Sequence, residues 1–129
     1  MLSIYDLEEI HPHSTHYAHG VGVPAGARLM LSNGHIGTRV DGTTPDDVAA
    51  QTEVIFERLE AVLAADGMAL TDIAQMTTYL TEVEYQDDYK RVRDRILGDH
   101  KPANTIVIVK ALVREPLKVE IQVVGAKVD

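Results

Sequence analysis

A long amphipathic segment constrains the fold of this 129-residue chain more than any other stretch: VDGTTPDDVAAQTEVIFERLEAVLAADG, residues 40–67. Side chains suited to a buried face recur in it at helical spacing, namely Val48, Thr52, Ile55, Leu59, Val62 and Leu63. Thr44 is a predicted N-cap, and Pro45 takes the first helical position. Asp46 and Asp47 put negative charge at the positive end of the helix dipole, and Gly67 supplies the stop. The segment predicts an amphipathic helix of about five turns.

Alternating side chains predict strands on both sides of this helix. Before it, GVGVPAGARLMLSNGHIG predicts a turn at residues 24–26 and then a strand from about Arg28, broken near Asn33 and Gly34. After it, DIAQMTTYLTEV predicts a strand packed on both sides. Its expected faces are Ile73, Thr77 and Tyr79 on one side and Ala74, Met76, Thr78 and Leu80 on the other.

The last part of the chain adds one helix and two strands. The helix is marked by Tyr85, Tyr89, Val92 and Ile96, and Gly98 closes it. The strands are NTIVIVKAL and LKVEIQVVGA, joined by VREP. In the second strand one face holds Leu117, Val119, Ile121 and Val123, and the other holds Lys118, Glu120 and Gln122. The polar face is not core.

The predicted order β, β, α, β, α, β, β indicates one α+β domain over residues 1–129, with both helices on one face of a single sheet. The all-apolar IVIV stretch would leave an apolar patch on the other face, which a monomer seldom exposes. We therefore expect other subunits to cover that face in a closed cyclic assembly.

Charge and composition narrow the function classes. The net charge is −8, so a nucleic-acid partner is not expected. KRVRDR at residues 90–95 follows QDD and contains Asp94, which favours a solvated helix face. The absence of cysteine excludes disulfides and thiolate catalysis. With no secretion signal and no apolar run of about 18 residues, we expect a soluble, cytoplasmic protein without a membrane partner.

Five stretches belong together: HYAHGV, SNGHIG, DDVAAQTEVIFERLEAVLAADG, TTYLTEV and GDHKPANT…VEIQVV. In this order they resemble the RidA/YjgF family of enamine/imine deaminases over nearly the whole chain, and the spacing from Thr81 to Pro102 fits without a gap. The resemblance implies a homotrimer of chorismate-mutase-like subunits without a cofactor. It also implies clefts between neighbouring chains that hydrolyse imines, such as 2-iminobutanoate, to keto acids and ammonia.

The resemblance also implies roles for individual residues. Tyr17 matches a tyrosine that lines the cleft, Gly34 the glycine of the family's SGQI segment, and Glu120 the carboxylate taken to hold or activate the attacking water. Asn104 replaces an arginine that pairs with the substrate carboxylate, and Thr105, the next residue, is a further substrate-contact candidate. Further substrate-contact candidates that depart from the family pattern are Asn33, His35 and Glu84. The cleft is expected to be more polar and less cationic than in the deaminases.

Each candidate also has an ordinary structural interpretation. Glu120 could form an interface salt bridge with Lys118 or Lys110, because structural ion pairs also place carboxylates on such faces. His35 could move a proton near neutral pH or simply end a strand. Arg39 is a candidate anion anchor to replace the missing arginine, although a solvent-exposed loop position is favoured for it.

The stretch HPHSTHYAH at residues 11–19 raises the question of a metal site. Its histidines lack the convergent spacing of known ligand sets, so we expect no metal. His16 and His19 are expected to border the cleft, and His11, His13 and His100 to be surface loop residues.

Two functions from different classes remain open. The first is a hydrolase acting on a small enamine or imine that is not necessarily a 2-imino acid. The second is a trimer that binds a small ligand or a partner without catalysis; Asn104 favours it, and Tyr17, Gly34 and Glu120 oppose it. The ribonuclease activity sometimes attributed to the family fits poorly with so acidic a chain.

Overall fold

The computed structural model describes residues 1–12 and 16–129. Its strands are β1 (Ser3–Tyr5), β2 (Gly20–Gly22), β3 (Arg28–Leu31), β4 (His35–Ile36), β5 (Ile73–Leu80), β6 (Ala103–Ile108) and β7 (Val119–Lys127). Its α-helices are α1 (Val48–Ala65) and α2 (Gln86–Leu97), and short 3-10 helices span Leu70–Asp72 and Val83–Tyr85.

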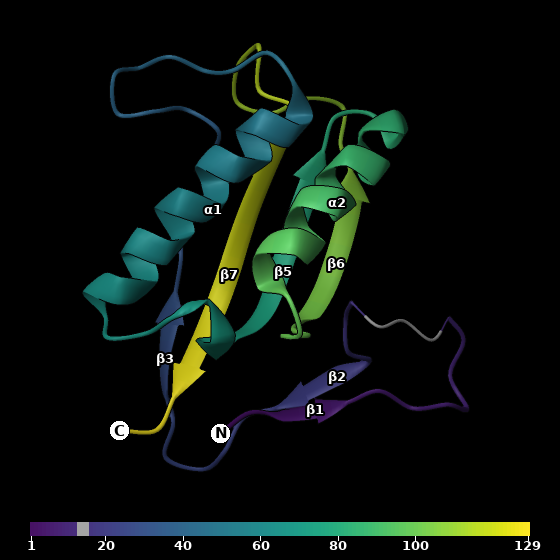
Figure 1. Ribbon diagram of the computed structural model, residues 1–129, viewed down its shortest axis with the longest axis vertical. Coiled ribbons are helices and arrows are strands. Elements are labelled where there is room, and N and C mark those ends of the chain that lie inside the picture. Colours follow the sequence, from purple (N-terminus) through teal and green to yellow (C-terminus); the bar gives the residue numbers. More distant parts are fainter. Residues whose placement is uncertain (13–15) are drawn as a thin grey trace.

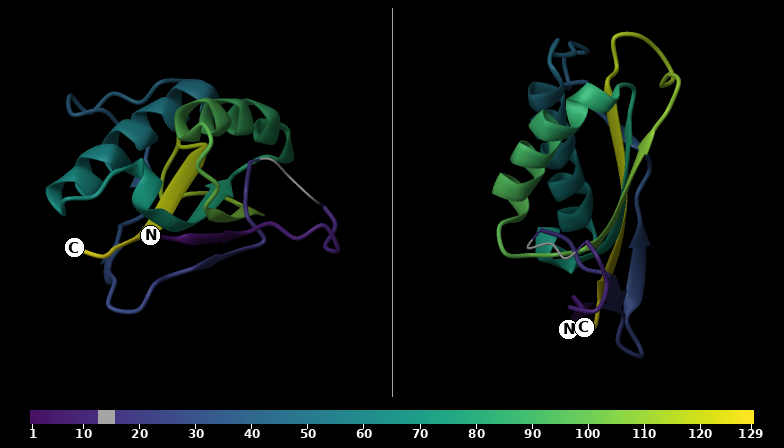
Figure 2. Two further views of the ribbon diagram at one scale, coloured as in Figure 1. Left: turned by 60° about the horizontal axis from the view of Figure 1, so that its bottom comes forward. Right: turned by 90° about the vertical axis from the view of Figure 1, so that its right-hand side faces the viewer.

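The main sheet is mixed and is covered by helices on one face only. Its strand order is β3-β7-β5-β6, and β4 also pairs with β7. β5 and β6 run parallel, whereas β7 is antiparallel to β3, β4 and β5. Both helices lie on the same side of this sheet (Figures 1 and 2). The predicted α+β arrangement of two helices on a mixed sheet is therefore confirmed.

A second, two-stranded sheet was not predicted. β1 and β2 pair antiparallel, with Ile4 opposite Val21, and lie beside one end of the main sheet (Figure 1). The expectation of a single sheet is wrong in this respect. Each of these strands has only three residues, which is too short for an alternating pattern to be recognised in the sequence.

The hydrophobic core lies between the helices and the main sheet. Val119, Ile121 and Val123 of β7 are at most 3% exposed and pack against α1 and α2, as their alternation predicted. β5 differs from the prediction at its start, because a register shift between Ile73 and Gln75 interrupts the alternation. Ile73 consequently lies in the core and not on the face of Thr77.

Helix α1 begins three residues later than predicted. Asp47 is the N-cap, and its side chain accepts a hydrogen bond from the Ala50 amide at 2.6 Å. Thr44 instead shares a hydrogen bond with the Thr38 hydroxyl at 2.9 Å, which holds the preceding loop. The Thr44 prediction is wrong because the ionised cap nearer the helix offers the stronger acceptor. The stop is as predicted: Gly67 takes a φ of +71° just beyond the helix.

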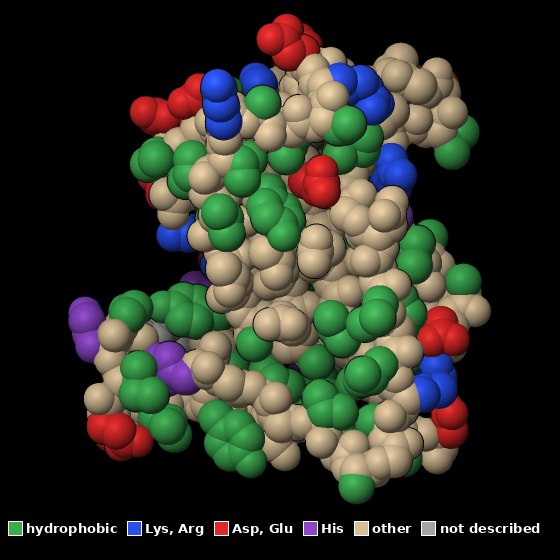
Figure 3. Space-filling view, turned by 180° about the vertical axis from the view of Figure 1, so that it is seen from behind, with side chains coloured by type: hydrophobic (Ala, Val, Ile, Leu, Met, Phe, Trp, Pro, Cys, Tyr) green, Lys and Arg blue, Asp and Glu red, His purple; other side chains and the backbone are tan. Residues whose placement is uncertain are grey.

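The other face of the main sheet is open in the single chain. Alternation and register place on it Thr77 and Tyr79 of β5, Thr105 and Val107 of β6, and Glu120 and Gln122 of β7. Leu29 and Leu31 of β3 add exposed apolar side chains. Figure 3, a view from behind, shows hydrophobic side chains interspersed with polar ones. No helix among the described residues is long and apolar enough to cross a membrane.

Candidate functional site

Glu120 and Gly34, which were predicted to share a site, lie against each other on the open face of the sheet. Glu120 stands opposite Ile36 of β4 and Tyr79 of β5. A Cβ built on Gly34 would lie 3.0 Å from Glu120 Cδ, and closer still to Oε2. The carboxylate therefore rests over the bare Cα of Gly34, and any side chain at residue 34 would displace it.

Tyr17 and Asn104 meet in a different place, a cavity of about 290 Å³ on the helix side of β6. It is lined by His16, Tyr17, Lys90, Arg93, Asp94, Asn104 and Ile106. Asn104 stands opposite Met76, which is in the core beneath the helices. By strand alternation Asn104 and Glu120 consequently point to opposite faces of the sheet. We call this cavity the α2 pocket.

Backbone contacts hold Tyr17 at the α2 pocket. The amide of the next residue, Ala18, donates to the Pro102 carbonyl at 3.2 Å, and Ala18 forms a parallel bridge with Ala103. Ala18 is itself buried. This pairing attaches the segment before β2 to the start of β6, the strand that carries Asn104.

A polar network lies beneath α2 and reaches the α2 pocket through Arg93. The hydroxyls of Thr78 and Tyr89 share a hydrogen bond at 2.6 Å. Burial raises the pKa of Tyr89, and hydrogen bonding to Thr78 offsets part of that shift. Arg93 donates from Nε to Asp94 Oδ1 at 2.8 Å, and its guanidinium lies 5.6 Å from the centre of the Tyr89 ring. Asn104 Oδ1 is buried and accepts no hydrogen bond from any described residue.

Arg93 lines this pocket, although it was not among the site residues predicted from the sequence. KRVRDR was interpreted as a solvated helix face, yet Arg93 is only 3% exposed. The prediction is wrong for this residue, although it holds for Arg91, whose side chain is 64% exposed and pairs with Asp88. The available signal was spacing: Arg93 follows the predicted core residue Tyr89 by four positions and so lies on the same helix face.

The remaining candidates lie apart from the α2 pocket. Thr105 is on the open face with Glu120, and Asn33 is exposed just before Gly34. Glu84 is exposed in the 3-10 helix ahead of α2. His35 stands opposite Ile121 and is buried on the helix side. Burial, and next the charge of Arg58, lower its pKa.

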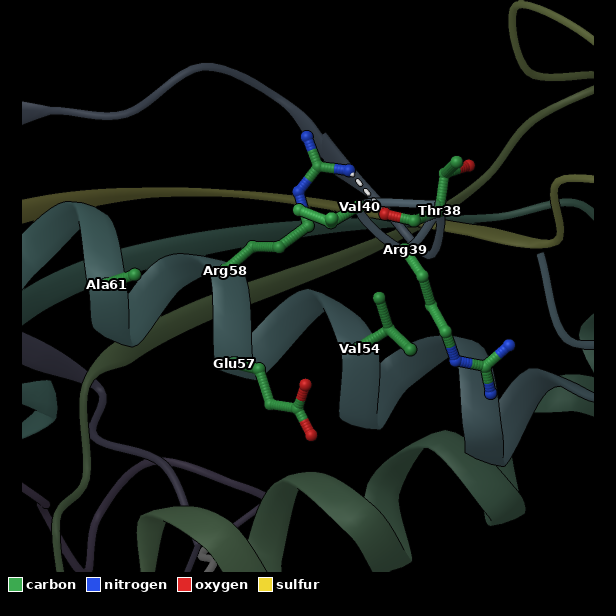
Figure 4. Close-up of a pocket in the computed structure, with 7 residues that line it drawn as sticks. All are labelled: Thr38, Arg39, Val40, Val54, Glu57, Arg58 and Ala61. Atoms are coloured by element: carbon green, nitrogen blue, oxygen red, sulfur yellow. Dashed lines mark hydrogen bonds between the residues drawn. The ribbon is translucent and has the colours of Figure 1, made fainter. Parts of the chain in front are cut away.

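Arg39 lies in the loop before α1, as Figure 4 shows. It borders an open cavity of about 580 Å³ along the outer side of α1, together with Val54 and Glu57. Arg58 lines the same cavity and donates to the carbonyls of Ile36 and Thr38 at 3.2 and 2.9 Å. Arg39 is exposed, and this cavity includes neither Glu120 nor Asn104.

The histidines of residues 11–19 have separate surroundings. His16 lines the α2 pocket and lies 3.6 Å from Asp94. His19 Nδ1 accepts from the Leu7 amide at 2.9 Å, and its Nε2 lies 2.8 Å from the Pro12 carbonyl, so the ring fixes the loop after β1. His13 is outside the described residues. Within the described ranges, no cluster of three His, Asp or Glu side chains could hold a metal ion.

His100 is not a free surface histidine. It is partly buried, and its Nε2 lies 2.7 Å from the Ile73 carbonyl at the start of β5. The default expectation for His100 is therefore wrong, because the turn after α2 brings it over the end of the sheet.

Comparison with known proteins finds one family over most of the chain. The family described as Endoribonuclease L-PSP matches residues 9–127. The RutC family protein YjgH of Escherichia coli is 35% identical over 71 residues, a match that spans 54% of each chain. TdcF of Escherichia coli, assigned by name to the reactive intermediate deaminases, is 25% identical over 109 residues, 82% of this chain and 84% of TdcF.

Solved structures share the fold. The Rid-family protein YyfB of Yersinia pestis gives a TM-score of 0.86 at 20% identity, covering 98% of both chains. The Escherichia coli TdcF structure, which has bound serine, gives a TM-score of 0.73 at 25% identity, with 86% of this chain and 87% of TdcF covered. At 20% identity, the likeness to YyfB shows the fold alone.

Proposed function

The chain belongs to the Endoribonuclease L-PSP family, and from this premise we propose that it is a hydrolase that deaminates a small enamine or imine. Each subunit is one domain of residues 1–129, and three subunits form a homotrimer with the working clefts between them. The observation that carries the proposal is the Glu120 carboxylate resting over Gly34 on an open sheet face.

The opposite placement of two residue groups supports a cleft between subunits. Tyr17 and Asn104 line the α2 pocket, whereas Glu120 points from the other face of the same sheet. A small substrate cannot touch both groups within one chain. In a closed ring, the open face of one subunit meets the edge of the next, so each cleft combines Glu120 of one chain with Tyr17 and Asn104 of another.

Imine hydrolysis requires little more than positioning and one acid–base group. Glu120 accepts a proton from water as the water oxygen bonds to the imine carbon and the C=N electron pair moves to nitrogen. The proton is then delivered to that nitrogen. In the resulting tetrahedral carbinolamine, Glu120 takes the hydroxyl proton and passes it to the amine nitrogen. The C=O double bond then forms as the C–N bond breaks, and ammonia leaves behind a carbonyl product. An enamine first takes a proton at carbon and enters the same sequence as the imine.

A relative supports the size and class of the substrate. TdcF is named for deamination of reactive intermediates, and its structure contains serine, a small molecule with an amine and a carboxylate. In this chain the residue matching the deaminases' carboxylate-binding arginine is Asn104, so the ligand is anchored differently.

The test measures ammonia release from freshly generated 2-iminobutanoate and from a 2-aminomuconate-type enamine. Replacing Glu120→Gln removes the proton acceptor at constant size and is expected to lower kcat by about a hundredfold or more. Glu60→Gln, the same change at an exposed site on α1, is the matched control and should retain full activity. Full activity in Glu120→Gln, or no hydrolysis of either substrate by the unaltered protein, would refute the proposal.

A further inference from the structure

The α2 pocket contains an arginine, Arg93, that is not among the residues to which the family resemblance assigns a role. Arg93 comes from α2, is 3% exposed, and lines the pocket beside Asn104. An arginine is seldom buried so fully unless its charge is paired. Among the described residues that line this pocket, Asp94 alone carries a carboxylate.

The charges around the α2 pocket do not cancel. Lys90 and Arg93 contribute two cations, and Asp94 contributes one anion. Asp94 also lies 3.6 Å from His16 Nδ1 through its other oxygen, so its charge is shared. The pocket is therefore locally cationic on a chain whose net charge is −8. A local cationic site of this kind attracts a small anion.

The hydrogen-bonding groups of Arg93 are only partly used. A guanidinium has five N–H donors, and Asp94 takes the Nε donor. The remaining donors, on the two Nη atoms, are available to other acceptors, the Tyr89 hydroxyl and a bound ligand among them. Two parallel N–H groups of this kind match the two oxygens of a carboxylate.

Asn104 offers the complementary group. Its Oδ1 is buried at the same pocket and has no donor among the described residues. A buried acceptor without a donor costs about 1–3 kcal/mol, which a ligand N–H would recover. The pocket thus presents a cation for a carboxylate and an acceptor for an amine or imine nitrogen.

We propose that Arg93, a residue outside the roles implied by the family resemblance, anchors the carboxylate of an acidic substrate in the α2 pocket. Arg93 and Lys90 bind the carboxylate, and Asn104 Oδ1 accepts a hydrogen bond from the substrate nitrogen. The inference rests on the proposed function for the reaction, but the ligand class follows from this pocket alone.

A purely structural ion pair makes a different prediction. If Arg93 only fixes Asp94 and the Tyr89 ring, its replacement would lower stability and would affect acidic and neutral ligands alike. If it anchors a carboxylate, its replacement weakens the binding of acids selectively. The comparison of an acid with a neutral ligand of the same shape separates the two roles.

The experiment is titration calorimetry with 2-oxobutanoate, a stable keto acid, and with 2-butanone, its neutral counterpart. The unaltered protein is expected to prefer the acid. Arg93→Met should weaken binding of 2-oxobutanoate by about tenfold to a hundredfold, the loss of one or two charge-assisted contacts, and leave 2-butanone unchanged. Arg91→Met removes a cation from the exposed side of the same helix and should bind like the unaltered protein.

Thermal melting would show whether Arg93→Met folds. Two further variants test the same role of Arg93 if it does not. Arg93→Lys keeps the charge without the fork and should give an intermediate loss. Asn104→Asp leaves Arg93 in place and adds a competing carboxylate, so it should also weaken acid binding selectively. Equal binding of acid and neutral ligand by the unaltered protein, or unchanged acid binding in these variants, would overturn the inference.

The two proposals fail in distinguishable ways. Binding of a stable ketone needs no turnover, so a protein that prefers 2-oxobutanoate through Arg93 but hydrolyses no imine would contradict the proposed function alone. Hydrolysis of 2-iminobutanoate with an unchanged KM in Arg93→Met would contradict only the role of Arg93.

Discussion

Gln51 connects three parts of the chain at the base of the strand that carries Glu120. It lies on α1 and is fully buried. Its Nε2 donates to the carbonyls of Pro45 and Pro116 at 2.9 and 3.1 Å, and its Oε1 accepts from the Lys118 amide at 2.9 Å. The side chain thereby fixes the loops before α1 and before β7.

Replacing Gln51→Leu keeps the size of the side chain and removes all three hydrogen bonds. The Lys118 amide is partly buried and loses its partner, while water can reach the exposed Pro116. With about 1 kcal/mol for each hydrogen bond and about 1 kcal/mol more for the poorly hydrated amide, we expect a loss of roughly 3–4 kcal/mol in the free energy of unfolding. That is a large share of the 5–15 kcal/mol typical of a whole domain.

Urea denaturation at fixed subunit concentration measures this loss, and Gln51→Glu provides a matched control. The new carboxylate would face two carbonyl oxygens, so its pKa in the folded protein would rise above the unfolded value of about 4.3. Its protonated form restores one donor, so the deficit of Gln51→Glu should be smallest at low pH and grow as pH rises through the raised pKa. A Gln51→Leu protein within about 0.5 kcal/mol of the unaltered one would refute the reasoning.

Three further predictions concern the site and its support. His35→Gln should make the free energy of unfolding depend less on pH. Because the pKa of His35 is lowered in the folded protein, its contribution to that free energy is present above the unfolded value of about 6.5 and is lost as pH falls. Urea titrations at pH 7.5 and 5.5 would detect the difference. Gly34→Ala should displace the Glu120 carboxylate and lower kcat with little change in melting temperature. Tyr89→Phe should lose the bond to Thr78 and about 1–2 kcal/mol of stability, measured by urea denaturation.

The sequence predicted those parts of the fold that depend on local periodicity. The stripe through Ile55 and Leu59 and the alternation of Val119, Ile121 and Val123 each report burial at a fixed period, and the structure confirms them. The extra residue at the start of β5 and the three-residue strands β1 and β2 leave no such period, so they were missed.

The site was predictable only in part, because its geometry depends on pairing between distant segments. Family resemblance brought Gly34 and Glu120 together, and the structure places them in contact. That Asn104 points to the opposite face follows from its register with Met76, which no local pattern reveals. Arg93 was predicted to be solvated from the charges of KRVRDR, whereas its spacing of four residues from Tyr89 places it on the buried side of the helix.

The central claim is that a working cleft draws Glu120 from one subunit and Asn104 from its neighbour. Glu120→Gln and Asn104→Leu, each expected to disable one half of the cleft, would be co-expressed with different tags, and trimers carrying both tags would be purified for the ammonia-release assay. One of the three clefts in each mixed trimer would then combine two unaltered halves, so about one third of the original activity should return. Mixed trimers no more active than the two variants alone would contradict a shared cleft.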